Sequence, residues 1–281
     1  SGIAKPDVAI ITNIGTAHIG LLGSRENILK AKLEILEGLN KNGTLIINYD
    51  NDLLNQWYEK EKGKYNIITY GTQEGSMILG KNAVFHENGT DCEAIIDSKT
   101  YKVHIPVGGE HFVSNSLCAL SVAKIFKIPI EDALKGIENF ELTKKRMEIK
   151  QAKCGAMVIN DCYNANYDSM KAALDYLGKL PNQRKIAVLG DMLELGKYSK
   201  ELHEKVGNIV AENKIDMLIC VGDESKNIAK SAEEKGIKNI FICNTNQEAI
   251  EILNKKINKN DVILLKASNG LKFTQICDAI C

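Results

Sequence analysis

Short apolar runs alternate with longer amphipathic stretches along most of this chain, a pattern typical of α/β proteins. The alternation is most regular in the second half. Strand-like runs occur there at 157–159, 186–189, 217–220, 240–242 and 262–265, and helical stretches lie near 168–179, 199–213, 224–235, 246–258 and 270–280. Strands that are joined through helices need crossover connections, which produce a parallel sheet. We therefore expect a Rossmann-like domain in this half.

The first half has a less regular pattern. Val8–Thr12 is almost uninterruptedly apolar, as in a buried parallel strand, and a similar run follows at 44–48. Residues 25–39 have helical periodicity, and helices are also expected near 113–127 and 129–136. Between Met77 and Val107 polar and apolar residues alternate, which predicts strands with one solvated face. The pattern predicts an α/β domain with a strand-rich insert. A buried strand this close to the first residue also suggests that the chain begins inside a domain.

The two halves meet near a basic segment. Lys144, Lys145 and Arg146 interrupt the apolar pattern, and we place the domain boundary there, giving residues 1–146 and 147–281. A chain of 281 residues is long enough for two domains that each bury a core.

The composition of the chain argues against several classes of function. Lys plus Arg total 36 and Asp plus Glu total 36, so no net charge favours nucleic acid or an anionic membrane. No apolar run approaches the roughly 20 residues that span a bilayer, and the first residues lack the features of a signal peptide. We expect a cytoplasmic monomer whose partners are small molecules. The eight cysteines form no C-x-x-C pair, which favours reduced, buried thiols.

Polar segments follow three of the strand-like runs in the second half. They are 160–169, 190–196 and 266–270. Parallel sheets bind ligands at the carboxyl ends of their strands, so these segments predict a pocket. Asn166 and Asp168 also suit a turn or a helix N-cap, and that alternative stays open. The phosphate-loop pattern G-x-x-x-x-G-K-[ST] occurs nowhere in the chain.

Several residue blocks, taken in order, resemble the Mur ligases. They are Asn13-x4-His18, Lys32, Gly108 to Asn115, Arg146, Asp161 to Asn166, Gly190 to Gly196, and Lys266-Ala267-Ser268. The resemblance covers nearly the whole chain. It implies three domains: one for a UDP-sugar, a central ATPase and a Rossmann-like domain for the incoming amine. Against that plan the chain is expected to lack the first domain and the opening of the second, including the phosphate loop.

The resemblance also implies a reaction. The Asp161 to Asn166 and Gly190 to Gly196 blocks are similar to the branch that adds D-alanyl-D-alanine to UDP-N-acetylmuramoyl-tripeptide, with ATP and Mg2+ as cofactors. The carboxylate would become an acyl phosphate that the amine then attacks. We expect the isolated chain to be inactive. The alternatives are another Mur ligase, a folylpolyglutamate synthetase, or a non-catalytic nucleotide-binding module.

Two residues are expected to serve the metal. By resemblance, His18 binds or orients Mg2+, and Lys32 does so after carbamylation, because an ammonium cannot ligate a cation that prefers oxygen. Carbamylation requires a lysine that is neutral often enough to react, as burial would make it. Alternatively, His18 is structural and Lys32 is a solvated position on a helix face.

The remaining roles also follow from the resemblance. Asn115 would recognise adenine, Asp161 the ribose, and Arg146 the ATP phosphates, with Asn13 also at the nucleotide site; Lys32, His18 and Arg146 would be catalytic. Otherwise Asn115 and Arg146 are ordinary surface residues. The residues expected to bind substrate are Tyr163, Asn164, Asn166, Asp191, Lys266 and Ser268. Departures from the family pattern occur at Phe112, Tyr167 and Asn269.

Overall fold

The computed structural model describes residues 1–86, 89–141, 143–181 and 184–281. The chain forms two compact units. The first comprises Ser1–Gly15 and Leu22–Glu141, and the second comprises Thr16–Leu21 and Leu142–Cys281. The second unit therefore begins a few residues before the boundary expected after Arg146, and it also takes in a short segment from early in the chain.

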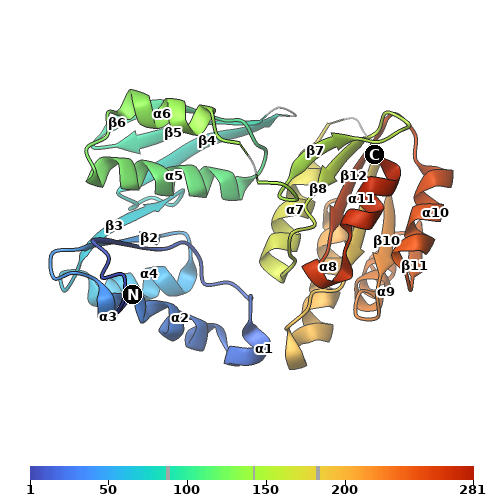
Figure 1. Ribbon diagram of the computed structural model, residues 1–281, viewed down its shortest axis with the longest axis horizontal. Coiled ribbons are helices and arrows are strands. Elements are labelled where there is room, and N and C mark those ends of the chain that lie inside the picture. Colours follow the sequence, from blue (N-terminus) through green and yellow to red (C-terminus); the bar gives the residue numbers. More distant parts are fainter. Residues whose placement is uncertain (87–88, 142, 182–183) are drawn as a thin grey trace. The chain divides into compact units, whose positions relative to one another are not determined.

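The first unit is built on a mixed six-stranded sheet in the order β1-β2-β3-β4-β5-β6 (Figure 1). The strands β1 (Val8–Ile11), β2 (Thr44–Asn48), β3 (Asn66–Gly71) and β4 (Ile78–His86) pair in parallel. The strands β5 (Gly89–Ile96) and β6 (Lys99–Ile105) continue the sheet in antiparallel fashion. The predicted parallel strands and strand-rich insert are confirmed.

Helices cover this sheet. They are α2 (Arg25–Leu33), α3 (Ile35–Gly38), α4 (Asp52–Glu61), α5 (Glu110–Ile125) and α6 (Ile130–Glu138). The single turn α1 (Ile19–Leu22) lies mostly in the segment Thr16–Leu21 of the second unit. Helix α5 packs on β2, β3 and β4, and α6 packs on β6. The expected single helix over 25–39 is wrong, because the N–H of Glu34 bonds to the carbonyl of Lys32 and breaks the helical ladder there.

The second unit is built on a sheet in the order β11-β10-β9-β12-β8-β7. The strands β8 (Met157–Asn160), β9 (Arg184–Gly190), β10 (Met217–Val221), β11 (Ile240–Cys243) and β12 (Asp261–Lys266) are parallel. The short strand β7 (Glu148–Gln151) is antiparallel to β8. The Rossmann-like prediction is confirmed. Every residue of the central strand β12 is buried, as expected for a parallel strand covered on both faces.

Helices connect the successive parallel strands of this unit, and a last helix follows β12. They are α7 (Tyr167–Lys179), α8 (Ser199–Glu212), α9 (Lys226–Glu234), α10 (Asn246–Lys256) and α11 (Thr274–Ile280), with short 3-10 turns η1 (Gly196–Tyr198) and η2 (Asn269–Leu271). Helices α7, α8 and α9 pack against one another in sequence, and α10 packs against α11.

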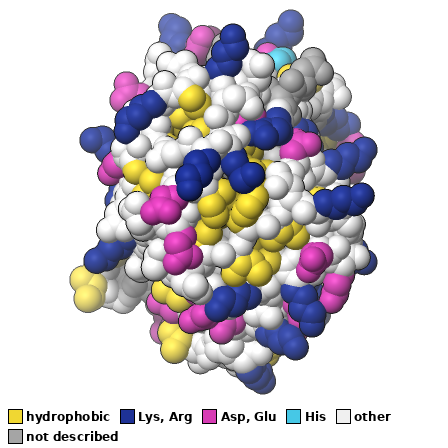
Figure 2. Space-filling view, turned by 90° about the vertical axis from the view of Figure 1, so that its right-hand side faces the viewer, with side chains coloured by type: hydrophobic (Ala, Val, Ile, Leu, Met, Phe, Trp, Pro, Cys, Tyr) yellow, Lys and Arg dark blue, Asp and Glu magenta, His cyan; other side chains and the backbone are white. Residues whose placement is uncertain are grey.

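The edge strand β11 has no further neighbour among the described residues, and its Ile242 is 53% exposed. Figure 2 views the side on which α10 and β11 lie and shows apolar side chains interspersed with many charged ones. Charged side chains beside an open edge discourage pairing with another chain.

The cysteines behave as their spacing predicts. All eight are free thiols, and six of them are buried. Burial raises the pKa of the Cys92 thiol to about 11 and that of Cys277 to about 12, so both stay protonated near neutral pH. Within the part of the chain that the structure describes, no helix is long and apolar enough to cross a bilayer.

Candidate functional site

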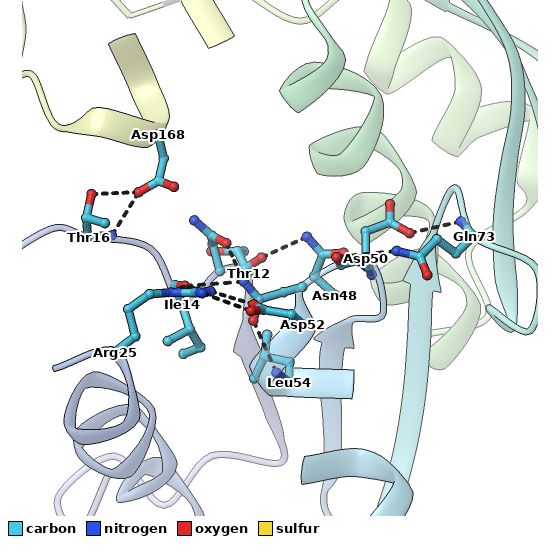
Figure 3. A network of polar contacts seen from close by, with 12 residues as sticks. Thr12, Ile14, Thr16, Arg25, Asn48, Asp50, Asp52, Leu54, Gln73 and Asp168 are labelled. Carbon is cyan, nitrogen blue, oxygen red and sulfur yellow. Dashed lines mark hydrogen bonds and ion pairs between the residues drawn. The ribbon is translucent and has the colours of Figure 1, made fainter. Parts of the chain in front are cut away.

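The first part of the site lies in the first unit, where the chain leaves β1. Asn51 donates from Nδ2 to Asn13 Oδ1 at 2.8 Å and to the Ile14 carbonyl at 3.3 Å. Arg25 donates to the same carbonyl through Nε and Nη2. Its Nη1 and Nη2 also donate one hydrogen bond each to the carboxylate of Asp52 (Figure 3). These bonds keep the pKa of the Asp52 carboxyl below its usual value. Side chains from α2 and the start of α4 thus fix the end of β1.

Lys32 is attached to this same strand end. Its Nζ donates to the carbonyl oxygen of Asn13 at 2.6 Å. The side chain is exposed overall, yet neighbouring atoms desolvate it enough to lower its pKa. The direction of that shift is the one that carbamylation requires, because only the neutral amine reacts. The structure therefore brings the predicted residues Asn13 and Lys32 together.

Asn115 lies on the exposed face of α5. Its neighbour Ser114 accepts a hydrogen bond of 3.4 Å from Asn48 Nδ2, which also donates to the Thr12 carbonyl at 3.1 Å. Asn48 thereby links the ends of β1 and β2 to the first turns of α5. An exposed amide at this edge of the sheet is accessible to a ligand.

In the second unit, Asp161 and Lys266 form a buried pair. Lys266 is only 2% exposed, and its Nζ lies 2.5 Å from Asp161 Oδ2 and 3.0 Å from the Asn164 carbonyl. The other carboxylate oxygen of Asp161 accepts from the Met147 N–H at 3.2 Å. Lys266 therefore supports the loop after β8, and it is not among the residues that line the pocket described below. Each oxygen of Asp161 keeps a further lone pair for an additional donor.

Arg146 is bound to the same loop. Its guanidinium lies 4.0 Å from the ring centroid of Tyr163, a cation-π arrangement. The Tyr163 N–H donates to the Lys145 carbonyl at 3.1 Å. The basic segment 144–146 is thus fixed to the second unit by backbone and side-chain contacts.

A pocket of about 270 Å³ opens beside this loop. Among the predicted substrate-binding residues, Tyr163, Asn164, Asn166 and Ser268 line it. Asn166 also caps α7, since its side chain accepts from the Ser169 N–H at 2.8 Å and the Ser169 hydroxyl accepts in return from the Asn166 N–H. The N-cap alternative is therefore correct for Asn166, in addition to its place in the pocket.

Asp191 does not line this pocket. One carboxylate oxygen accepts from the Ser225 N–H at 2.7 Å, and its backbone carbonyl accepts from the Ser268 N–H at 3.1 Å. A Cβ added to Gly222 would lie 2.5 Å from the same carboxylate, so the fit there is tight. Asp191 joins the loops after β9, β10 and β12, which is a structural role.

His18 belongs to the segment Thr16–Leu21, which packs with the second unit. Asp168 accepts from both the N–H and the hydroxyl of Thr16 at 2.8 Å (Figure 3), and His18 Nδ1 lies 2.7 Å from Glu194 Oε2. His18 and Glu194 both line the pocket. Sequence reasoning did not select Glu194, although it lies within the Gly190 to Gly196 block.

The donor set is compatible with Mg2+. Within the described residues, no three His, Cys, Asp or Glu side chains gather into a metal site. Mg2+ commonly keeps several waters and binds through one or two protein groups and substrate phosphates, so such a cluster is not required. Within the second unit, His18 could supply one such ligand through a ring nitrogen.

Comparison with known proteins supports the resemblance to the Mur ligases. Residues 1–123 match the Mur ligase middle domain, and residues 145–269 match the Mur ligase glutamate ligase domain. The UDP-N-acetylmuramoyl-tripeptide--D-alanyl-D-alanine ligase of Bacillus subtilis is 36% identical over 278 residues, which cover 98% of this chain and 59% of that protein. The enzyme of the same name from Synechocystis is 33% identical, over 96% of this chain and 56% of its own length.

Solved structures agree with these sequence relatives. MurF from Acinetobacter baumannii superposes with a TM-score of 0.89 at 29% identity, covering 99% of this chain and 60% of that one. MurF ligase from Thermotoga maritima, solved in complex with ADP, gives 0.86 at 25% identity, covering 99% and 62%. The chain thus spans about three fifths of the length of these relatives. With its two halves matching two successive Mur ligase domains, this chain belongs to the Mur ligase family.

Proposed function

We propose that this chain provides the middle and carboxyl-terminal parts of an ATP-dependent ligase that joins D-alanyl-D-alanine to UDP-N-acetylmuramoyl-tripeptide. Relatives that carry this name match nearly the whole chain. The observation that carries the proposal is the pocket, because residues from the loops after β8 and β12 that resemble this branch line it together. The reaction would take place in the cytoplasm.

The reaction has two steps. The terminal carboxylate of the tripeptide attacks the γ-phosphorus of ATP, giving an acyl phosphate and ADP. The free amino group of the dipeptide then attacks the acyl carbon, the new amide bond forms, inorganic phosphate leaves, and the nitrogen loses a proton. Negative charge accumulates on phosphoryl oxygens in the first step and on the carbonyl oxygen in the second, so nearby cations and donors stabilise both transition states.

The nucleotide contacts are assigned as follows. The exposed amide of Asn115 would pair with the adenine edge, since an amide both donates and accepts. Asp161 would accept from the ribose hydroxyls with its remaining lone pairs. Arg146, presented over the Tyr163 ring, would bind phosphate oxygens with its forked donors. Mg2+, when bound, would neutralise phosphate charge, and the resemblance assigns its protein ligands to His18 and to carbamylated Lys32.

The dipeptide would occupy the pocket beside the loop after β8. Tyr163, Asn164, Asn166 and Ser268 offer hydroxyl and amide groups that suit a peptide and its carboxylate. Asp191 and Lys266 would support this pocket indirectly. The Asp191 carbonyl accepts from the Ser268 N–H, and Lys266 Nζ donates to the Asn164 carbonyl.

Phosphate release tests the assignment. A chain extended upstream to the length of the relatives should release phosphate from ATP only when the UDP-tripeptide and D-alanyl-D-alanine are both present, while the 281-residue chain alone should show no turnover. Dependence on a single amino acid or on glutamate would instead indicate a sister ligase or a folylpolyglutamate synthetase. Turnover by the unextended chain would contradict the expectation that ligation also needs the further length that the relatives have.

A further inference from the structure

Glu194 lies on a loop that is fixed from several sides. The Met192 N–H donates to Nε2 of the buried His203 at 3.0 Å, and the Leu193 N–H donates to Ser268 Oγ at 2.9 Å. Glu194 itself has a φ of +65°, a left-handed conformation that is uncommon for a residue with a side chain. Such a conformation persists where the surroundings determine it, and it often marks functional positions.

Two contacts join Glu194 to the segment that carries His18. The carboxylate oxygen Oε2 lies 2.7 Å from His18 Nδ1, and the Glu194 carbonyl accepts from the Gly20 N–H at 3.2 Å. A Cβ on Gly20 would approach that carbonyl oxygen to 2.5 Å, so only glycine permits this approach. His18 also has a left-handed backbone, with a φ of +61°. A backbone hydrogen bond at Gly20 and a side-chain contact at His18 Nδ1 thus both hold the His18 segment against Glu194.

The chemistry of this pair determines which ring nitrogen is available. An ionised carboxylate only accepts hydrogen bonds, so the hydrogen between the two groups belongs to His18 Nδ1. In the neutral ring, Nε2 then carries the lone pair. Among the described residues no hydrogen bond to Nε2 is found, and both side chains line the pocket.

We propose that Glu194 is a positioning residue that holds His18 as its Nδ1–H tautomer and makes Nε2 the atom offered to a divalent cation. Metal-binding histidines usually donate their second ring N–H to a carboxylate or carbonyl, and loss of that partner typically weakens metal affinity about 10–100-fold. The role of the cation rests on the proposed function. The tautomer of His18 does not, because it is a property of this chain alone.

The tautomer can be measured directly. We would record ring-nitrogen NMR spectra of the 15N-labelled 281-residue chain at about pH 8, where histidine is mostly neutral, and assign His18 among the five histidines with His18→Gln. The wild type should show the Nδ1–H form, and Glu194→Ala should lose that preference. Glu201→Ala, which removes an exposed carboxylate that pairs with Lys205, should leave it unchanged.

The buried His203 controls for damage to the loop. Its Nδ1 donates to the Ser199 carbonyl at 2.7 Å while its Nε2 accepts from Met192, so its own tautomer should be the same in every variant whose loop is intact. If Glu194→Ala also alters His203, Glu194→Met, which has a similar length but no carboxylate or amide oxygen to accept from His18 Nδ1–H, replaces it. An Nε2–H form of His18 in the wild type, or no change on loss of the carboxylate with His203 intact, overturns the proposal.

Mn2+ provides the second readout. Paramagnetic broadening of the His18 ring signals should require about 10–100-fold more Mn2+ in Glu194→Ala than in the wild type or in Glu201→Ala. Equal broadening in all three chains would overturn the link to the cation. Absence of ligase activity in the extended chain, with the tautomer and broadening as expected, would refute the proposed function and leave the role of Glu194 standing.

Discussion

The Asp161–Lys266 pair places an ion pair with a buried lysine beneath the loop after β8. Lys266 lies at the end of the fully buried strand β12, and Asp161 is the residue that connects it to the basic segment through Met147. Removal of one member of a buried pair leaves an uncompensated charge, which costs more than the pair itself contributes. The loop that lines the pocket therefore depends on a residue outside it.

We predict that Lys266→Met lowers the free energy of unfolding by about 3–5 kcal/mol, because Asp161 is left charged and largely buried. Urea denaturation measures the change. Lys205→Met, which removes an exposed pair with Glu201, should cost less than about 1 kcal/mol. The double variant Asp161→Asn/Lys266→Met should recover part of the loss; equal effects of the two single lysine variants would contradict this account.

Tyr163 should act through Arg146. In the extended ligase, Tyr163→Ala removes the ring beneath the guanidinium, and we expect the KM for ATP to rise about 2–5-fold, as a partly exposed cation-π contact of about 0.5–1 kcal/mol implies. Tyr163→Phe keeps the ring and should leave the KM for ATP unchanged. A rise in the KM for ATP in Tyr163→Phe as large as that in Tyr163→Ala would show that the ring beneath Arg146 is not what supports nucleotide binding.

The pocket residues lie after the ends of strands and at the starts of helices. Asn166 combines both functions, since it caps α7 and lines the pocket. Asn166→Ala should lower stability by about 1 kcal/mol and also reduce kcat/KM for the dipeptide in the extended ligase. Thr245→Ala removes the comparable cap of α10, whose capping residue is not among those that line the pocket, and should reduce stability alone. Similar loss of activity in both would show that capping accounts for the effect.

Arg25 connects α2 to the end of β1 and to the start of α4. Its bond to Asp52 lowers the pKa of that carboxyl, so the stabilisation is fully present above the usual Asp range and disappears as the pH falls through the lowered value. Arg25→Met should therefore destabilise the chain near pH 7, and the loss should shrink as the pH falls below the usual Asp range, because the bond to Asp52 stabilises the wild type less there. Unfolding by urea at pH values on either side of that range tests this. A loss that is independent of pH would assign the effect to the Ile14 carbonyl alone.

The sequence predicted those elements whose pattern is local. The apolar runs of β8, β9, β10, β11 and β12 are short and bounded by polar residues, so their parallel sheet was predictable. The antiparallel strand β7 was missed because Glu148–Gln151 alternates over only four residues. The break between α2 and α3 was missed because the apolar spacing continues across Glu34.

The site shows the same division. Asn166 and Ser268 were predictable from polar residues that follow strands, whereas the supporting roles of Asp191 and Lys266 depend on partners that no spacing reveals. Glu194 and His18 are 176 residues apart in the chain, and Asp161 and Lys266 are 105 apart. Only the folded chain brings such pairs together, which is why sequence reasoning selected Asp191 from its block and overlooked Glu194.

At the level of the entire chain, each of the two units has its own sheet and its own core, and each contains part of the proposed site. Asn13, Lys32 and Asn115 belong to the first unit, and the pocket residues with Arg146 belong to the second. The proposed ligase therefore requires both units.

The most direct test of this account is phosphate release from ATP and Mg2+ by the extended chain with UDP-N-acetylmuramoyl-tripeptide, measured with and without D-alanyl-D-alanine. The account predicts release only with the dipeptide, and formation of one amide product for each phosphate. Phosphate release that does not depend on the dipeptide, or that requires a single amino acid or glutamate in its place, would contradict the account.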